Sequence, residues 1–110
     1  MKVLVFGYSD NSDRYSFLLA EQLIEHNHET IKFNPRINNS EVLDTKFETV
    51  TMYVSKAVSD KFQDFLLSLD FDRIIFNPGS ENEQLEIKLK ALGVEVIHGC
   101  TLVMLRTSQF

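Results

Sequence analysis

The chain has 110 residues, one cysteine and a formal net charge of −5 at pH 7. This length suffices for a domain that buries roughly two thirds of its unfolded surface, so neither a disulfide nor a metal is required for stability. The acidic balance argues against nucleic acid as a partner, and the lack of a leader or of a long apolar run predicts a cytoplasmic protein that does not span a membrane.

Strand and helix patterns alternate along the chain. We predict strands at 2–6, 30–34, 50–54, 73–77 and 94–98, and helices at 13–27, 57–69 and 82–92. For residues 40–43 we expect a single turn or an open loop. The sequence therefore predicts an α/β fold in which residues 1–110 form one Rossmann-like domain, a three-layer sandwich. Its five-stranded sheet would be parallel, with the order 3-2-1-4-5.

Apolar residues recur at helical spacing in two of the predicted helices. The stripe in 57–69 consists of Val58, Phe62, Phe65, Leu66 and Leu69, and the stripe in 82–92 consists of Leu85, Leu89 and Leu92. Glu86 and Lys90 form an i, i+4 pair, and Gly93 is the expected left-handed stop. The apolar run 102–105 predicts either a cover for the sheet edge or a homodimer contact.

The turn after the first strand has the pattern Gly7-x-Ser9-x-x-Ser12. Dinucleotide-binding turns have glycine at all three of these positions. Such turns direct backbone N–H groups at a phosphate near the positive end of a helix. Gly7 permits the tight turn, and Ser9 adds a hydroxyl. We expect phosphate binding here; the alternative is that Ser12 or Asp13 only caps the helix.

The predicted strand order places the topological switch point between the first and fourth strands. Ligands of such sheets lie over the carboxyl ends of the strands at this point. The segments Gly7-Tyr8-Ser9 and Asn77-Pro78-Gly79-Ser80 follow these two ends. Both segments are therefore predicted to border the ligand.

The second predicted strand ends in Asn34-Pro35-Arg36, without the acid that would bind the ribose of NAD. Pro35 stops the strand, and the guanidinium of Arg36 can bind a phosphate through two parallel donors. A phosphorylated ribose occurs in NADP and in coenzyme A. The alternative is an ordinary solvated arginine.

Histidines and the cysteine give little sign of catalysis. His26 and His28 lie near the end of the first helix, where a structural role is favoured and no metal-ligand spacing is seen. His98 and Cys100 stand two apart after the last strand, and a Cys–His pair can form a nucleophile. A buried, unreactive cysteine is the favoured reading.

Several segments together resemble the small stand-alone CoA-binding domain family, whose members are small bacterial proteins. The matching segments are Gly7-Tyr8-Ser9, Arg14-Tyr15-Ser16, Asn34-Pro35-Arg36, Tyr53-Val54-Ser55, 78–82 and Gly99-Cys100. The family is similar to the nucleotide-binding domain of succinyl-CoA synthetase α subunits. Ligase chemistry is not expected, because nothing here resembles the histidine-phosphorylating domain of that enzyme.

The resemblance implies a module that binds coenzyme A or an acyl-CoA without a claimed reaction. It implies these ligand-binding residues: Gly7, Tyr8, Ser9, Asn11, Arg14, Tyr15, Asn34, Pro35, Arg36, Tyr53, Val54, Ser55, Pro78, Gly79 and Asn82. It also places Cys100 near the ligand, where an exposed thiol could form a mixed disulfide with coenzyme A. The alternatives are an NADP-binding, oxidoreductase-like fragment and a chain that acts only as an interaction partner.

Overall fold

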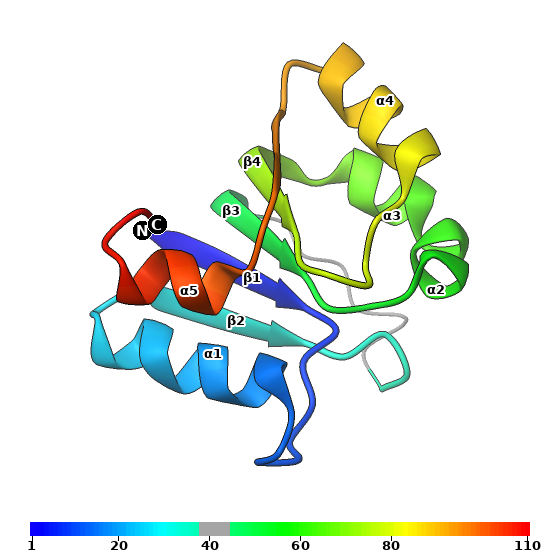
Figure 1. The fold of residues 1–110 in the computed structure, drawn as a ribbon. Helices are drawn as coiled ribbons and strands as arrows, with labels where there is room; N and C mark the ends of the chain where they lie inside the picture. The colour runs from blue at the N-terminus through cyan, green and yellow to red at the C-terminus, as the bar shows by residue number, and fades with distance from the viewer. Residues whose placement is uncertain (38–44) are drawn as a thin grey trace.

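The computed structural model describes residues 1–37 and 45–110, and the turn or loop expected at 40–43 lies outside these residues. Five parallel strands form the sheet (Figure 1): β1 (Lys2–Phe6), β2 (Glu29–Phe33), β3 (Lys46–Met52), β4 (Asp70–Phe76) and β5 (Glu95–His98). The predicted α/β class and the parallel sheet are confirmed.

The strand order is β2-β1-β3-β4-β5, whereas the sequence predicted 3-2-1-4-5. Strand β1 pairs with β2 on one side and with β3 on the other. Strand β2 forms the sheet edge, where its exposed Glu29 and Lys32 are solvated, whereas the last four residues of β3 are buried. The switch point therefore lies between β1 and β3, and not between the first and fourth strands.

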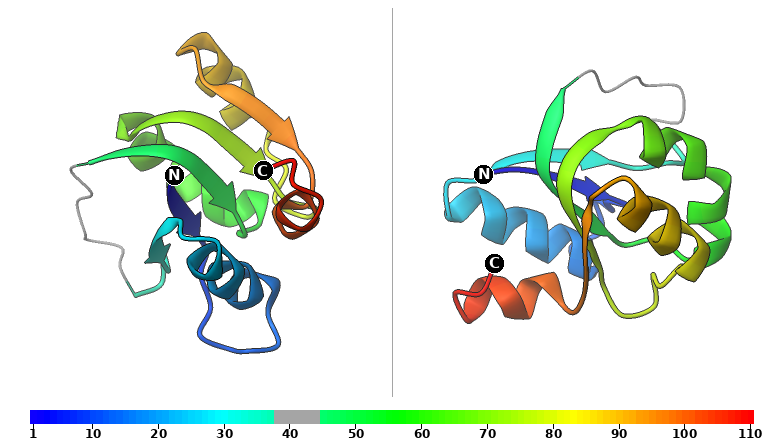
Figure 2. Two further views of the ribbon diagram at one scale, coloured as in Figure 1. Left: turned by 90° about the vertical axis from the view of Figure 1, so that its left-hand side faces the viewer. Right: turned by 90° about the horizontal axis from the view of Figure 1, so that it is seen from above.

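Helices cover both faces of the sheet. Helices α1 (Tyr15–Glu25) and α5 (Thr101–Arg106) lie on one face, and α2 (Lys56–Lys61), α3 (Gln63–Ser68) and α4 (Glu83–Ala91) lie on the other (Figure 2). Side chains of β1 alternate between these layers: Val3 and Val5 contact the α1–α5 side, and Leu4 and Phe6 join the larger core. The three-layer sandwich is confirmed.

The larger core is rich in stacked aromatic rings. Phe33 stacks on Phe6 and on Phe65, with centroid distances of 5.2 and 5.3 Å. The ring of Phe62 meets Phe6 edge-on at 5.8 Å, and the chain leaves helical geometry at Phe62. The predicted helix 57–69 is therefore two short helices. Apart from Val58, its predicted apolar stripe packs against this core.

The other helices differ from the predictions mainly at their ends. Helix α1 is shorter than the predicted 13–27, and strands β3 and β4 begin earlier than predicted. In α4, Leu85 and Leu89 are buried but Leu92 is 63% exposed. Gly93 has the expected left-handed φ of 87°, and Glu86 pairs with Lys90 at 3.0 Å.

The apolar run 102–105 forms helix α5, which the sequence did not predict. Leu102 and Leu105 are buried against Val3, Val5 and α1. The run thus covers a face of the sheet next to α1 and not the sheet edge. Among the described residues, no helix combines the length and apolar character needed to cross a membrane.

Candidate functional site

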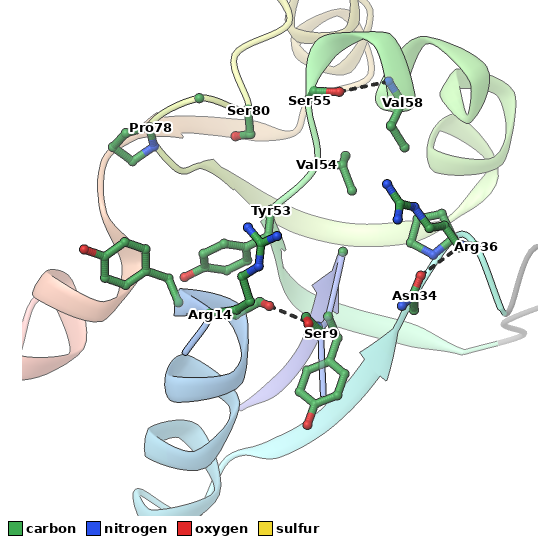
Figure 3. Close-up of a pocket in the computed structure, with 16 residues that line it drawn as sticks. Ser9, Arg14, Asn34, Arg36, Tyr53, Val54, Ser55, Val58, Pro78 and Ser80 are labelled. Atoms are coloured by element: carbon green, nitrogen blue, oxygen red, sulfur yellow. Dashed lines mark hydrogen bonds between the residues drawn. The ribbon is translucent and has the colours of Figure 1, made fainter. Parts of the chain in front are cut away.

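A cavity of about 540 Å³ lies over the carboxyl ends of β1 to β4 (Figure 3). The loops that follow these four strands and the start of α1 form its wall. The lining residues are Gly7, Tyr8, Ser9, Arg14, Tyr15, Ser16, Asn34, Pro35, Arg36, Tyr53, Val54, Ser55, Val58, Pro78, Gly79 and Ser80. The cavity therefore spans the switch point between β1 and β3.

Most of the site residues implied by the resemblance line this cavity, and two do not. Asn11 is exposed in the loop before α1, where its Oδ1 accepts a bond from the N–H of Asp13. Asn82 is buried at the start of α4. Ser16 and Val58 line the cavity without having been predicted to contact a ligand; Ser16 lies in a matching segment, whereas Val58 was assigned to a core stripe. Ser80 lines the cavity, as expected for the segment 77–80, but Asn77 of that segment is buried outside the lining.

Gly7 holds two turns in close contact. Its φ is +102°, and a Cβ there would lie 2.7 Å from Val54 Cγ1 and 2.9 Å from the carbonyl oxygen of Tyr53. The N–H of Tyr53 donates to the carbonyl of Phe6 at 2.8 Å, which extends the β1–β3 pairing into this region. Only glycine fits here without displacing the turn after β3.

The first three backbone donors of the turn after β1 are already used within the chain. The N–H groups of Gly7 and Tyr8 both donate to the carbonyl of Phe33, at 2.8 and 3.0 Å. The N–H of Ser9 donates to Ser16 Oγ at 3.0 Å. These three amides of the expected cradle therefore already have acceptors within the protein. The Ser9 hydroxyl accepts from the N–H of Asn11 at 3.1 Å and keeps its own proton for donation.

The start of α1 offers further donors. Arg14 is the N-cap residue and makes no side-chain cap bond, so neither Ser12 nor Asp13 caps the helix as the alternative reading expected. The first N–H groups of a helix have no acceptor within it and carry partial positive charge. Tyr15 and Ser16, the first two residues of α1, line the cavity.

Two arginines reach the cavity from different elements (Figure 3). Arg14 precedes α1 and extends beside Tyr53, while Arg36 follows β2 and extends toward Val54 and Val58. Both are exposed, and within the described part of the chain neither makes an ion pair. No described lining residue is acidic. In a chain of net charge −5, this cavity is locally cationic.

The loop that carries Arg36 is fixed at its base. Pro35 is buried, and the N–H of Arg36 donates to Asn34 Oδ1 at 2.9 Å. This bond closes a local turn immediately after β2. The backbone of Arg36 is therefore held at the cavity edge, while its side chain extends toward Val54 and Val58 (Figure 3).

Two of the three tyrosines that line the cavity, Tyr53 and Tyr8, contribute to its wall in different ways. Burial raises the pKa of Tyr53, so its phenol is neutral across the physiological range. Its hydroxyl is buried without a hydrogen-bond partner among the described residues. The ring of Tyr8 stacks on Phe17, with centroids 6.3 Å apart, and Lys32 Nζ lies 5.1 Å from its centre. Tyr8 is thus already engaged by α1 and β2.

Two buried asparagines brace the loops after β3 and β4. Asn77 Nδ2 donates to Thr51 Oγ1 and to the carbonyl of Met52, both at 2.8 Å, and its Oδ1 accepts from the N–H of Thr101 at 2.8 Å. Asn82 Nδ2 donates to Ser59 Oγ at 2.8 Å and to Asp60 Oδ1 at 2.9 Å. Asn82 is therefore a support of the cavity rim and not part of its surface.

The histidines and the cysteine serve separate contacts. His26 Nδ1 donates to the carbonyl of Gln22 at 2.7 Å, which agrees with the expected role at the end of the first helix. His98 pairs with Glu86 at 2.8 Å, whereas Cys100 is half-buried against the Val3–Val5 side of the core. His98 and Cys100 therefore do not form a pair. The described residues contain no group of three potential metal ligands.

Comparison with known proteins gives a consistent family assignment. A family model described as a CoA binding domain matches residues 1–106. One solved structure, described as an uncharacterized protein, is 37% identical, with a TM-score of 0.91 over 99% of this chain and 97% of that chain.

More distant structures share the fold alone. A hypothetical protein from Pyrococcus horikoshii is 15% identical, with a TM-score of 0.83 over 97% of this chain and 82% of that one. A protein from Thermus thermophilus is 18% identical, with a TM-score of 0.84 over 99% and 90%. No curated protein matches the chain. With the family model covering nearly all of its length, the chain belongs to the CoA-binding domain family.

Proposed function

We propose that this protein binds coenzyme A or an acyl-CoA through its phosphate groups and acts as a binding module. The observation that carries the proposal is the cavity at the β1–β3 switch point, which holds two arginines and no acidic residue among the described lining. Guanidinium groups bind phosphates through parallel, charge-assisted hydrogen bonds. Family membership supports coenzyme A as the source of these phosphates.

The position of Arg36 favours a phosphorylated ribose. In Rossmann-like sites, the residue after the second strand contacts the adenosine ribose, through an acid for a free hydroxyl or through an arginine for a phosphate. Here the strand end carries Asn34, Pro35 and Arg36. We therefore place the 3′-phosphate of coenzyme A beside Arg36.

NADP is the second candidate, because its ribose phosphate would also suit Arg36. The cavity size does not separate the two ligands, since about 540 Å³ lies within the usual range of roughly 300–1,000 Å³ for ligand sites. The family description names coenzyme A, and for this reason we rank NADP second. A direct comparison of affinities separates these two functions.

Calorimetric titration with coenzyme A, acetyl-CoA, NADP and NAD tests the proposal. We expect coenzyme A and acetyl-CoA to bind with similar affinity and NAD to bind at least about tenfold more weakly, a difference of about 1.4 kcal/mol. Tighter binding of NADP than of coenzyme A would favour the second candidate. Equal affinities for coenzyme A and NAD would refute recognition through the ribose phosphate.

A further inference from the structure

We infer that a second cavity, between the C-terminal ends of α1 and α5, binds a small organic anion whose charged group is attached to an apolar body. This cavity has a volume of about 470 Å³. Helices α1 and α5 lie side by side and both end at the amino-terminal side of the sheet, away from the cavity described above (Figure 1). The two cavities share no lining residue, so this inference does not rest on the proposed function.

The ionisable side chains that line the second cavity are all basic. Arg106 is exposed in the last turn of α5, and within the described part of the chain it makes no ion pair. His26 follows α1, and His28 immediately precedes β2. No acidic residue is found among the described lining. In a chain of net charge −5, these side chains favour an anion at this position.

The C-terminal ends of two helices would by themselves oppose an anion, because unpaired carbonyl groups carry partial negative charge. In α1 the carbonyls of residues 22–24 accept bonds from the N–H groups of residues 26–28. At the end of α5 the carbonyls of residues 103–105 accept bonds from the N–H groups of residues 107–109. Because these carbonyls already have donors, the basic side chains dominate the charge of the cavity.

The two imidazole rings differ in the bonds that they already make. His26 Nδ1 donates to the carbonyl of Gln22 at 2.7 Å, so its Nε2 is left for a ligand. His28 Nδ1 is buried and has no hydrogen-bond partner among the described residues. Buried polar atoms are usually paired, and a bound ligand would supply the missing partner.

Leu105 and Phe110 give the second cavity an apolar wall. The ring of Phe110 is fixed from two sides: His28 meets it edge-on with centroids 5.3 Å apart, and the guanidinium carbon of Arg73 lies 4.6 Å from its centre. A fixed aromatic ring beside basic groups suits a ligand that has both an apolar body and a negative charge. Inorganic phosphate has no apolar body, so the lining favours an organic anion such as a carboxylate.

Binding of an anion should be accompanied by proton uptake. Burial, the N-terminal ammonium group and His26 lower the pKa of His28, whereas Glu48 raises it. The other charged groups around these rings are the guanidinium groups of Arg73 and Arg106. A bound anion favours the protonated imidazoles and so raises their pKa values. Its affinity should therefore rise as the pH falls from about 8 to about 6, where histidines gain their charge.

The test uses benzoate as the probe and benzamide as its neutral analogue. Each is titrated into ¹⁵N-labelled protein and followed by the amide shifts in NMR spectra, which also locate the site. The variants are Arg106→Ala and the matched control Lys61→Ala. Both side chains are exposed in the last turn of a six-residue helix, and Lys61 lines neither cavity.

We expect benzoate to shift the amides of the residues that line the second cavity, more strongly at pH 6 than at pH 8, and benzamide to leave them unchanged. Arg106→Ala should weaken benzoate by at least about threefold, the scale of an exposed charge contact. The Lys61→Ala control should bind benzoate like the parent.

Three results would overturn the inference. These are benzoate shifts confined to the first cavity, equal affinities for benzamide and benzoate, and an unchanged benzoate affinity in folded Arg106→Ala. If Arg106→Ala does not fold, His26→Gln decides, since its side-chain amide can still donate to the carbonyl of Gln22 but cannot gain a charge. This variant should show a weaker pH dependence of benzoate binding, and an unaltered pH dependence would refute the site.

Discussion

Replacing Gly7 by alanine tests how the two turns at the switch point fit together. The new Cβ would lie 2.7 Å from Val54 Cγ1 and 2.9 Å from the carbonyl carbon and oxygen of Tyr53. The side chain of Val54 can yield, but the backbone of Tyr53 is held by its bond to Phe6. A φ of +102° adds strain in any residue with a Cβ.

The two costs of Gly7→Ala can be separated by a matched control. Gly93 has a similar φ of +87°, but a Cβ there meets nothing within 4 Å. Gly93→Ala should therefore lower the free energy of unfolding only through strain, by about 1–3 kcal/mol. Gly7→Ala should cost a further 1–3 kcal/mol or so from overpacking. The effect of alanine on the unfolded chain is the same in both variants and cancels in the comparison.

Urea unfolding followed by circular dichroism measures both variants. We expect Gly7→Ala to be the less stable of the two, and we expect its penalty to shrink in a Val54→Ala background, because the nearest contact atom is then absent. If Gly7→Ala were no less stable than Gly93→Ala, the close contact between the two turns would not exist in solution. An unchanged penalty in the Val54→Ala background would assign the clash to the backbone of Tyr53 alone.

Two further predictions concern the polar support of the rim. Asn82→Ala removes the cap of α4 and the bonds to Ser59 and Asp60, so it should destabilise the protein by about 1–3 kcal/mol in urea unfolding. Asn11→Ala, in an exposed loop, should destabilise it less. Equal effects of the two substitutions would contradict the bracing role of Asn82. Hydrogen bonds from Lys56, Asn82 and Gln63 lower the pKa of Asp60 from 3.8 to about 2. A lowered carboxyl pKa stabilises the fold above about pH 4, and this contribution is lost as the pH falls toward 2. The urea midpoint of Asp60→Asn should therefore fall less steeply than that of the parent over this window, and parallel curves would show that Asp60 contributes nothing to it.

The fold class could be predicted from the sequence because its signals are local. The apolar runs 3–6 and 74–76 indicate strands that are covered on both faces, and glycines indicate turns. Both signals depend only on residues that are neighbours in the sequence. The strand order could not be read in this way. Strand β3 contains Thr49 and Thr51, which are both fully buried. Hydrogen bonds offset the cost of burying their hydroxyl groups: Arg73 Nε donates to Thr49 at 2.6 Å, and Asn77 donates to Thr51. These partners lie more than twenty residues away, so the sequence does not show that β3 is an interior strand.

The short elements also escaped the sequence pattern. Helix α5 has six residues, too few for a helical period to be recognised, and it is stable because Leu102 and Leu105 pack against α1 and β1. The predicted helix 57–69 showed a good period, yet the chain breaks at Phe62. In both cases tertiary packing determines the local structure more than the spacing of apolar residues does.

Within the site, residue positions could be predicted but the use of their donors could not. Gly7 was expected to bring backbone amides to a phosphate, whereas the structure uses the amides of Gly7 and Tyr8 to hold the end of β2 through the carbonyl of Phe33. That contact fixes the base of the loop bearing Arg36. The glycine turn therefore joins the ends of β1 and β2, and the amides of Gly7 and Tyr8 serve the fold.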